Sequence, residues 1–329
     1  MLRSARISKR KLLLGVFAAG LMICTLACVG LYGVSGAYGL NVLLRRGWTF
    51  WINVSLDDPR LSDAMRLALR DHSGAAEAGP FAWRPIVQGF EVAELPVIAA
   101  GGEVDRILLA RIDPARFRFV VRNEPAGNRE LADWMTGLGA ALVVNGSYFS
   151  LKGTPDTPIV SAGVRLGPRK YEAKHGAFVA SSTSVAIRDL TKEDWHTALN
   201  GADDAMVSYP LLVAEDGSNR VTADPRWLAN RSFVGVDKAG LIVVGTTKEA
   251  FFSLGRFATF LREAPLGLKA ALNLDGGPVA CQGIALGDYH RDFCGNWELT
   301  TRDDRLKLLR PAFGQGRWAM PIVLAVLPK

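Results

Sequence analysis

Two short segments place polar side chains and glycines directly after apolar runs. Asp275-Gly276-Gly277 follows Leu272-Asn273-Leu274, and Asn145-Gly146 follows Leu142-Val143-Val144. Each run has the character of a buried strand that follows a short amphipathic helix. A polar side chain at such a strand end projects into the crevice above it, and the glycines let the backbone approach a ligand or adopt a positive φ. The same residues are typical of hairpin turns, and by local pattern alone turns are favoured over a pocket, most strongly at Asn145-Gly146.

Two further side chains have types suited to chemistry. Arg231 opens an otherwise apolar strand, and a guanidinium group can donate two parallel hydrogen bonds to a phosphate. His175 is a possible proton carrier near neutral pH. Taken singly, Arg231 is better explained as an exposed edge residue and His175 as an ordinary structural histidine. The sequence contains no nucleophile elbow, Walker loop, zinc-protease helix or dinucleotide fingerprint.

The N-terminus predicts a membrane segment. Residues 1–11 are a basic tail with five Lys or Arg and no acid, and residues 12–38 carry no charge. This apolar stretch is long enough to cross a bilayer as a helix, and the charge asymmetry keeps the tail in the cytoplasm. We therefore expect a single-pass protein of a bacterial-type inner membrane, with its C-terminal domain in the periplasm or outside the cell. A signal peptide cleaved near Ser35-Gly36-Ala37 is the alternative.

The N-terminal tail also explains the net charge of the chain, which is +7. Without its five basic residues, 34 basic residues face 32 acidic ones. The remainder is nearly neutral, so the high isoelectric point reflects membrane topology and we expect no nucleic-acid partner.

Four cysteines divide into two pairs. Cys24 and Cys28 lie inside the apolar segment, whereas Cys281 and Cys294 lie in the exported part. In an oxidising compartment the second pair would form a disulfide worth roughly 3 kcal/mol, and two separate buried thiols are the alternative. We expect no structural zinc site because the chain has only four histidines.

The chain beyond the membrane segment predicts a connector followed by one compact domain. Residues 39–80 form the juxtamembrane connector with a short helix at 61–70, and residues 81–329 form the domain. Strand pairs are expected at 107–112 with 117–121 and at 232–236 with 241–244, and a closing strand at 321–326. Helices are expected at 130–138 and 254–262. We therefore predict an α+β fold, with a mixed β-sheet, hairpins and flanking helices.

The order of these segments resembles the phosphodiester glycosidase family, and the resemblance covers about residues 85–290. No single piece is specific, but the ordered set is. The pieces are 107–114, 143–149, Gly153-Thr154-Pro155, Ser161-Ala162-Gly163, 207–213 with Asp216-Gly217, 230–236 and 272–277.

The resemblance implies hydrolysis of the bond between a sugar's anomeric carbon and a phosphodiester oxygen, in envelope or extracellular glycans. It implies an active site at Asn145, Arg231 and Asp275. Two departures affect this expectation. Ser147 stands where the family commonly has glycine, and Pro278-Val279 stands where a further glycine and a serine are usual.

Within this hypothesis, Arg231 binds the phosphate, Asp275 stabilises the positively charged sugar ring and His175 carries a proton. The substrate-binding residues are Asn145, Gly146, Tyr148, Asn273, Gly276 and Gly277, with Phe149 as part of an apolar wall. No cofactor is required, although Asp275, Asp156 and backbone oxygens have the ligand type that a hard cation such as calcium prefers. The competing hypothesis is a non-catalytic module that binds envelope polysaccharide on the same fold.

Overall fold

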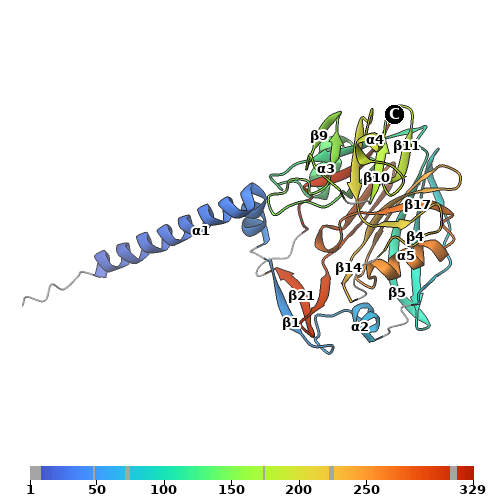
Figure 1. Ribbon diagram of the computed structural model, residues 1–329. Helices are drawn as coiled ribbons and strands as arrows, with labels where there is room; N and C mark the ends of the chain where they lie inside the picture. Colours follow the sequence, from blue (N-terminus) through green and yellow to red (C-terminus); the bar gives the residue numbers. More distant parts are fainter. Residues whose placement is uncertain (1–8, 47–48, 71–74, 173–174, 222–225, 312–316) are drawn as a thin grey trace, which may run out of the picture.

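The computed structural model describes residues 9–46, 49–70, 75–172, 175–221, 226–311 and 317–329. One helix, α1 (Lys9–Arg46), is long and apolar enough to cross a membrane by length and composition. Figure 1 shows it running out from a body built mainly of strands. Its regular geometry is interrupted at Gly36, where φ is 59°.

The last part of α1 packs on the body. Leu31 and Tyr38 are only 8% and 6% exposed, whereas the apolar side chains between Leu12 and Val29 are mostly exposed. The Tyr38 ring makes an edge contact with Phe149, with the ring centroids 5.2 Å apart. The exposed stretch therefore has the length of one bilayer crossing, and the following residues are held by the body.

The body contains four sheets. In the described ranges every strand pair is antiparallel, so the α+β class is confirmed but the sheets are not mixed. The eight-stranded sheet has the order β13 (Leu211–Val213), β17 (Leu268–Asn273), β15 (Ser232–Asp237), β16 (Ile242–Thr247), β5 (Gly102–Ile112), β4 (Phe90–Ala99) and β2 (Glu77–Ala78), with β3 (Arg84–Val87) also on β4.

The three other sheets are smaller. One five-stranded sheet has the order β19 (Tyr289–Cys294), β18 (Cys281–Leu286), β7 (Leu142–Asn145), β22 (Ile322–Pro328) and β6 (Phe117–Asn123). The other has the order β11 (Val185–Asp189), β10 (Gly176–Ala180), β12 (Asp204–Ser208), β8 (Ile159–Ser161) and β9 (Val164–Leu166). The four-stranded sheet has the order β1 (Thr49–Val54), β21 (Arg305–Pro311), β20 (Glu298–Arg302) and β14 (Leu228–Ala229).

The core lies on both faces of the eight-stranded sheet. Helices α2 (Asp63–Arg70) and α5 (Leu254–Glu263) pack with Ile107 and Leu109 of β5 on one face. On the other face, Leu108 and Ala110 pack with β7 and β22. Successive side chains of β5 point to opposite faces of the sheet, and both faces are buried. This strand is therefore apolar at consecutive positions. Helix α3 (Leu131–Leu138) covers the far side of β7 and β22.

Several sequence-based expectations are confirmed. The predicted helices correspond to α2, α3 and α5; Gly139 ends α3 in the left-handed conformation and Ser253 caps α5. The pair β15–β16 is a hairpin, and the predicted closing strand is β22. A further short helix, α4 (Trp195–Ala198), follows β11.

The other predicted hairpin is wrong. Residues 107–112 and 117–121 are strands, but β5 pairs with β4 and β16 whereas β6 pairs with β22. The turn Asp113–Arg116 carries the chain from one sheet to another, because both strands present apolar residues to the cluster between the two sheets.

The segment expected to be a connector, residues 39–80, contributes to the body. Strand β1 pairs with β21 along six residues, and α2 buries Met65 and Ala68 against the core. Much of this segment thus shares the packing of the domain that follows it.

Candidate active site

The two strand ends singled out in the sequence meet. The backbone N–H of Asp275 donates to the carbonyl oxygen of Gly146 at 3.0 Å, and the side-chain amide of Asn145 donates to the carbonyl oxygen of Asp275 at 2.7 Å. Neither segment is a hairpin turn, since β7 and β8 belong to different sheets, as do β17 and β18. The pocket interpretation is therefore the one that agrees with the topology.

Arg231 lies beside this junction and is only 5% exposed. Its Nε donates to the carbonyl oxygen of Phe252 at 3.2 Å and its Nη2 to that of Trp227 at 2.9 Å. The third nitrogen, Nη1, lies against Gly276. Within the described residues it donates to no backbone carbonyl, unlike Nε and Nη2. Burial lowers the pKa of Arg231, yet an arginine remains charged at neutral pH. The site thus holds a fixed positive charge with one donor edge available.

The two glycines after Asp275 make room for neighbouring charged groups. A Cβ on Gly276 would lie 3.2 Å from Nη1 of Arg231. Gly277 has a φ of 70°, and a Cβ there would lie 2.8 Å from Oε2 of Glu298. The glycines are needed because two charged side chains approach the backbone closely. Gly146 serves packing in a similar way, since its Cβ would meet Ile322 at 2.4 Å.

Glu298 is the main residue that the sequence analysis missed. It opens β20, faces Gly277 and accepts a 2.9 Å hydrogen bond from the indole N–H of Trp227. Cys281 and Cys294 form a disulfide, as expected, and this bond holds the segment that leads to Glu298 against the segment that follows Asp275. The predicted disulfide could have pointed to Glu298 as a site residue, because Glu298 comes only four residues after Cys294.

Aromatic residues form one wall of the site. Tyr148 stacks on Tyr209 with ring centroids 4.0 Å apart, and its hydroxyl donates to the carbonyl oxygen of Tyr209 at 2.9 Å. The amide of Asn273 donates to the Tyr148 hydroxyl at 2.8 Å. Asn273 is fully buried, and its side-chain N–H groups, like those of Asn145, donate to acceptors of the protein itself. We infer that both asparagines position other residues of the site.

His175 lies behind this wall. Its ring stacks on Tyr209 at 4.5 Å, and its Nδ1 is 2.5 Å from the hydroxyl of Tyr171. Burial lowers the pKa of His175, which favours the neutral imidazole. The face of Tyr209 thus separates His175 from Tyr148.

These groups enclose a cavity of about 340 Å³. This volume lies at the small end of the range for ligand pockets and suits one sugar ring with a phosphate. The cavity is lined by Tyr148, Tyr209, Trp227, Ala229, Arg231, Leu254, Asp275, Gly276 and Glu298. Tyr148, Arg231, Asp275 and Gly276 were predicted from the sequence, whereas Tyr209, Trp227 and Glu298 were not.

The electrostatics of the cavity favour a protonated Asp275. Burial, followed by the charge of Glu298, raises the pKa of Asp275 well above its ordinary value. Burial also raises the pKa of Glu298, opposed by the hydrogen bond from Trp227 and the charge of Arg231. The negative charge of Glu298 thus favours the protonated form of Asp275. The negative charge of Glu298 is better stabilised than that of Asp275, because the hydrogen bond from Trp227 and the charges of Arg231 and Arg302 offset the burial of Glu298.

The described residues contain no group of three or more His, Cys, Asp or Glu side chains that would hold a metal ion. Asp156, considered above as a cation ligand, lies near enough for its charge to raise the pKa of Asp275.

The two departures from the family pattern are accommodated by local packing. The Ser147 hydroxyl donates to the carbonyl oxygen of Val207 at 2.6 Å and contacts the Thr157 hydroxyl. Pro278 is buried in a short 3₁₀ helix, η1 (Gly277–Val279), at a position where the first helical turn does not use the backbone N–H. Ser147 and Pro278 thus support the backbone around the cavity.

Comparisons with known proteins agree with the resemblance drawn from the sequence. Residues 138–280 match the sequence model of the phosphodiester glycosidase family. A search of curated proteins found no match.

Structurally similar proteins that have been solved include the catalytic domain of zebrafish N-acetylglucosamine-1-phosphodiester alpha-N-acetylglucosaminidase, auto-inhibited by its pro-peptide. It is 15% identical, with 85% of this chain and 88% of that chain covered and a TM-score of 0.47. A hypothetical protein from Synechocystis is 16% identical, with 77% and 64% covered and a TM-score of 0.47. A putative exported protein from Burkholderia pseudomallei is 12% identical, with 68% and 74% covered and a TM-score of 0.38.

Proposed function

We propose that this chain, whose residues 138–280 match the phosphodiester glycosidase family, hydrolyses the bond between a sugar's anomeric carbon and a phosphodiester oxygen. One observation carries the proposal: Asp275 and Glu298 share a cavity with the buried guanidinium of Arg231. Two carboxyls are the groups that glycoside hydrolysis uses, and a fixed arginine is the group that a phosphodiester requires.

Each charged residue has a separate task in this mechanism. Arg231 binds the phosphate through the edge that carries Nη1 and neutralises charge on the leaving group. Asp275 holds a proton, gives it to the departing phosphate oxygen and recovers one from the water that adds to the anomeric carbon. Glu298, as the carboxylate, stabilises the positive charge that develops on the sugar ring until water adds to the anomeric carbon. The products are a free sugar and a phosphomonoester.

This assignment revises the sequence-based hypothesis for Asp275. From the sequence, Asp275 was the charged group at the sugar ring, because no second carboxylate was recognised. Glu298 accepts a hydrogen bond from Trp227 and is therefore the better candidate for the charged role.

The aromatic wall provides the surface for the sugar. Tyr148 lines the cavity, and burial together with the charge of Asp275 raises its pKa, so its hydroxyl stays protonated. Tyr209 contributes its ring beside it. An apolar ring face with few polar contacts is a common way to bind the less polar face of a sugar.

We also propose that α1 anchors the enzyme in a membrane and that the body acts on the exported side. The five basic residues before the helix and the exposed apolar stretch of α1 support this orientation.

The test is an assay of the full-length protein in nanodiscs against a panel of glycosyl-1-phosphodiesters, with release of reducing sugar as the readout. We expect turnover of at least one substrate, and a loss of roughly 100-fold or more in kcat for Asp275→Asn and for Glu298→Gln. Glu193→Gln is the matched control, because Glu193 does not line the cavity. Saturable glycan binding without turnover would instead identify a polysaccharide-binding module.

A further inference from the structure

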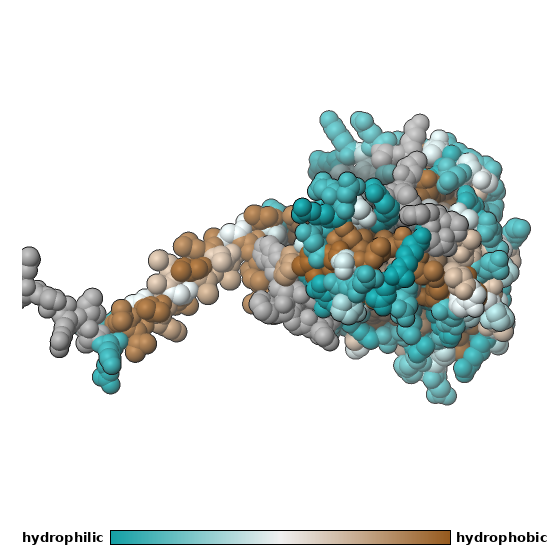
Figure 2. All heavy atoms as spheres, turned by 90° about the horizontal axis from the view of Figure 1, so that it is seen from below, coloured by the Kyte–Doolittle hydropathy of each residue, from teal (hydrophilic) through white to brown (hydrophobic). Residues whose placement is uncertain are grey.

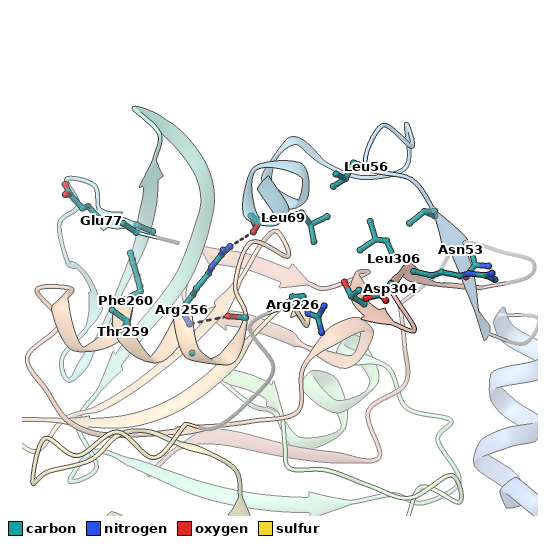
Figure 3. Close-up of a pocket in the computed structure, with 18 of the residues that line it drawn as sticks. Asn53, Leu56, Leu69, Glu77, Arg226, Arg256, Thr259, Phe260, Asp304 and Leu306 are labelled. Carbon is teal, nitrogen blue, oxygen red and sulfur yellow. Dashed lines mark hydrogen bonds between the residues drawn. The ribbon is translucent and has the colours of Figure 1, made fainter. Parts of the chain in front are cut away.

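A second and larger cavity lies beside the candidate active site. It has a volume of about 1010 Å³ and runs between β1, β21, α2 and α5. We name it the α2–α5 groove and define it by Val54, Leu56, Leu69, Phe260 and Leu306. Figure 3 shows Leu56, Leu69 and Leu306 around the same space, with Phe260 on the helix at its other side.

The groove has both apolar and charged lining, since Arg226, Arg256, Glu263 and Asp304 line it beside the five apolar residues. Leu56 follows β1, Leu306 lies in β21 where it pairs with Val54, and Leu69 lies in the last turn of α2. Arg256 crosses from α5 to α2 by donating to the carbonyl oxygen of Ala68 at 2.7 Å, which holds the two helices at their present separation (Figure 3). Small residues such as Gly255 leave the space unfilled.

The groove shares a wall with the candidate active site. Arg226 lines the groove and its neighbour Trp227 lines the site, while Leu254 lines the site between two groove residues, Ser253 and Gly255. The candidate active site and the groove therefore adjoin at Trp227 and Leu254.

The groove is linked to the proposed membrane anchor through β1. Strand β1 begins at Thr49, three residues after the end of α1, and its last residue is Val54, in the groove wall. Figure 2 shows apolar side chains on this side of the body, interrupted by hydrophilic ones. The segment that leaves the proposed anchor thus forms one wall of the groove.

We infer that the groove binds a long alkyl or prenyl chain, the second ester group of the glycosyl phosphodiester. The substrate would then be a sugar 1-phosphate esterified to a membrane lipid chain. This inference rests on the proposed function and specifies its substrate class. The chain lies along Leu56, Leu69 and Leu306, the phosphate at Arg231 and the sugar against Tyr148.

The experiment compares the methyl and decyl esters of one glycosyl 1-phosphate, using the full-length protein in nanodiscs at fixed lipid content. Each buried methylene contributes about 0.8 kcal/mol, or about fourfold, so partial burial of the chain gives a kcat/KM at least roughly 30-fold higher for the decyl ester. Leu56→Glu places a charge in the groove, and we expect it to reduce turnover of the decyl ester about tenfold and leave the methyl ester unchanged. Val164→Glu, at an exposed apolar position outside the groove, is the control. Equal kcat/KM for the two esters, or an equal loss for both in Leu56→Glu, would overturn the inference.

A binding measurement separates this inference from the proposed function. Methyl decyl phosphate has the chain and the phosphodiester but no sugar, so its binding can be followed by calorimetry even if no ester is hydrolysed. We expect saturable binding that is lost in Leu56→Glu and in Thr259→Trp, where the indole fills the groove from the exposed side of α5. Binding with this pattern but without hydrolysis would leave the groove assignment intact and contradict the proposed function. No binding to the wild type would refute the groove assignment.

Discussion

The side-chain amide of Asn145 donates a 2.7 Å hydrogen bond to the backbone carbonyl oxygen of Asp275, 130 residues further along the chain. Its Oδ1 accepts the backbone N–H of Cys281 at 3.1 Å. One buried side chain at the end of β7 thus fixes both the candidate catalytic residue and the first residue of the disulfide. The site is built where two sheets meet and is held there by an amide that does not line the cavity.

Replacing Asn145 with alanine should therefore lower both stability and activity. The substitution leaves a buried carbonyl and a buried N–H unpaired, at a cost of roughly 2–4 kcal/mol in the free energy of unfolding. Urea unfolding checks the stability, and the kcat of the folded fraction checks the position of Asp275. Asn200→Ala, at an exposed position, should change neither quantity.

Replacing Glu298 with glutamine should change the pH dependence of activity as well as its size. The charge of Glu298 raises the pKa of Asp275, so its removal lowers that pKa. In the wild type we expect activity to fall as pH rises through the raised pKa of Asp275, because its proton is lost there. The residual activity of Glu298→Gln should fall at a lower pH. A profile of the same shape and midpoint in both proteins would show that the two carboxyls do not interact.

The same carboxyl pair predicts how stability depends on pH. Asp275 binds its proton more tightly in the folded state than its ordinary pKa of 3.8 would allow. Between the ordinary and the raised pKa, the folded state holds more protons than the unfolded state, so the free energy of unfolding decreases as pH rises. Asp275→Asn removes this contribution and should be more stable, relative to wild type, at about pH 8 than at about pH 4. Denaturant midpoints of the two proteins at both pH values provide the measurement.

Removing the disulfide should affect the site as well as the fold. Cys281 and Cys294 close a loop with a sequence separation of 13, and such a loop contributes about 3 kcal/mol in the chain-entropy model. The paired variant Cys281→Ala with Cys294→Ala should melt at lower temperature and lose activity, because Glu298 follows this loop directly. The control is Cys24→Ala with Cys28→Ala, since both are exposed on α1. A melting shift without loss of activity would mean that β20 holds Glu298 without help from the disulfide.

The parts of this architecture that follow from local pattern could be predicted from the sequence. The glycine after α3, the serine before α5 and the two polar strand ends are local signals, and each lies where it was expected. The pairing of β6 with β22 was missed because apolar alternation does not specify which strand is the partner. Glu298 was missed because a glutamate at the start of a short strand looks exposed, and only long-range packing buries it against Gly277.

His175 provides a check on how far the catalytic machinery extends. The residue contacts Tyr209 and Tyr171 and does not line the cavity, so we expect it to act only through the position of the Tyr209 ring. His175→Gln should reduce kcat/KM by less than roughly tenfold and leave the pH profile in place, because no proton is lost from the reaction path. A loss as large as that of Asp275→Asn, with a shifted pH profile, would assign the proton-carrying role to His175 after all.

The contact between Tyr38 and Phe149 connects the membrane helix to the site, because Phe149 follows Tyr148 directly in the chain. Tyr38 is buried against Gly127, where a Cβ would lie 2.1 Å from its ring, and Asn41 donates to the carbonyl oxygen of Ala126. Tyr38→Ala removes the ring and should cost roughly 2–4 kcal/mol of docking energy. We expect faster amide hydrogen exchange in residues 147–153 and lower turnover of membrane-bound substrate. Tyr32→Ala, at an exposed position on the same helix, is the matched control. Unchanged exchange in Tyr38→Ala would show that the loop keeps its conformation independently of α1.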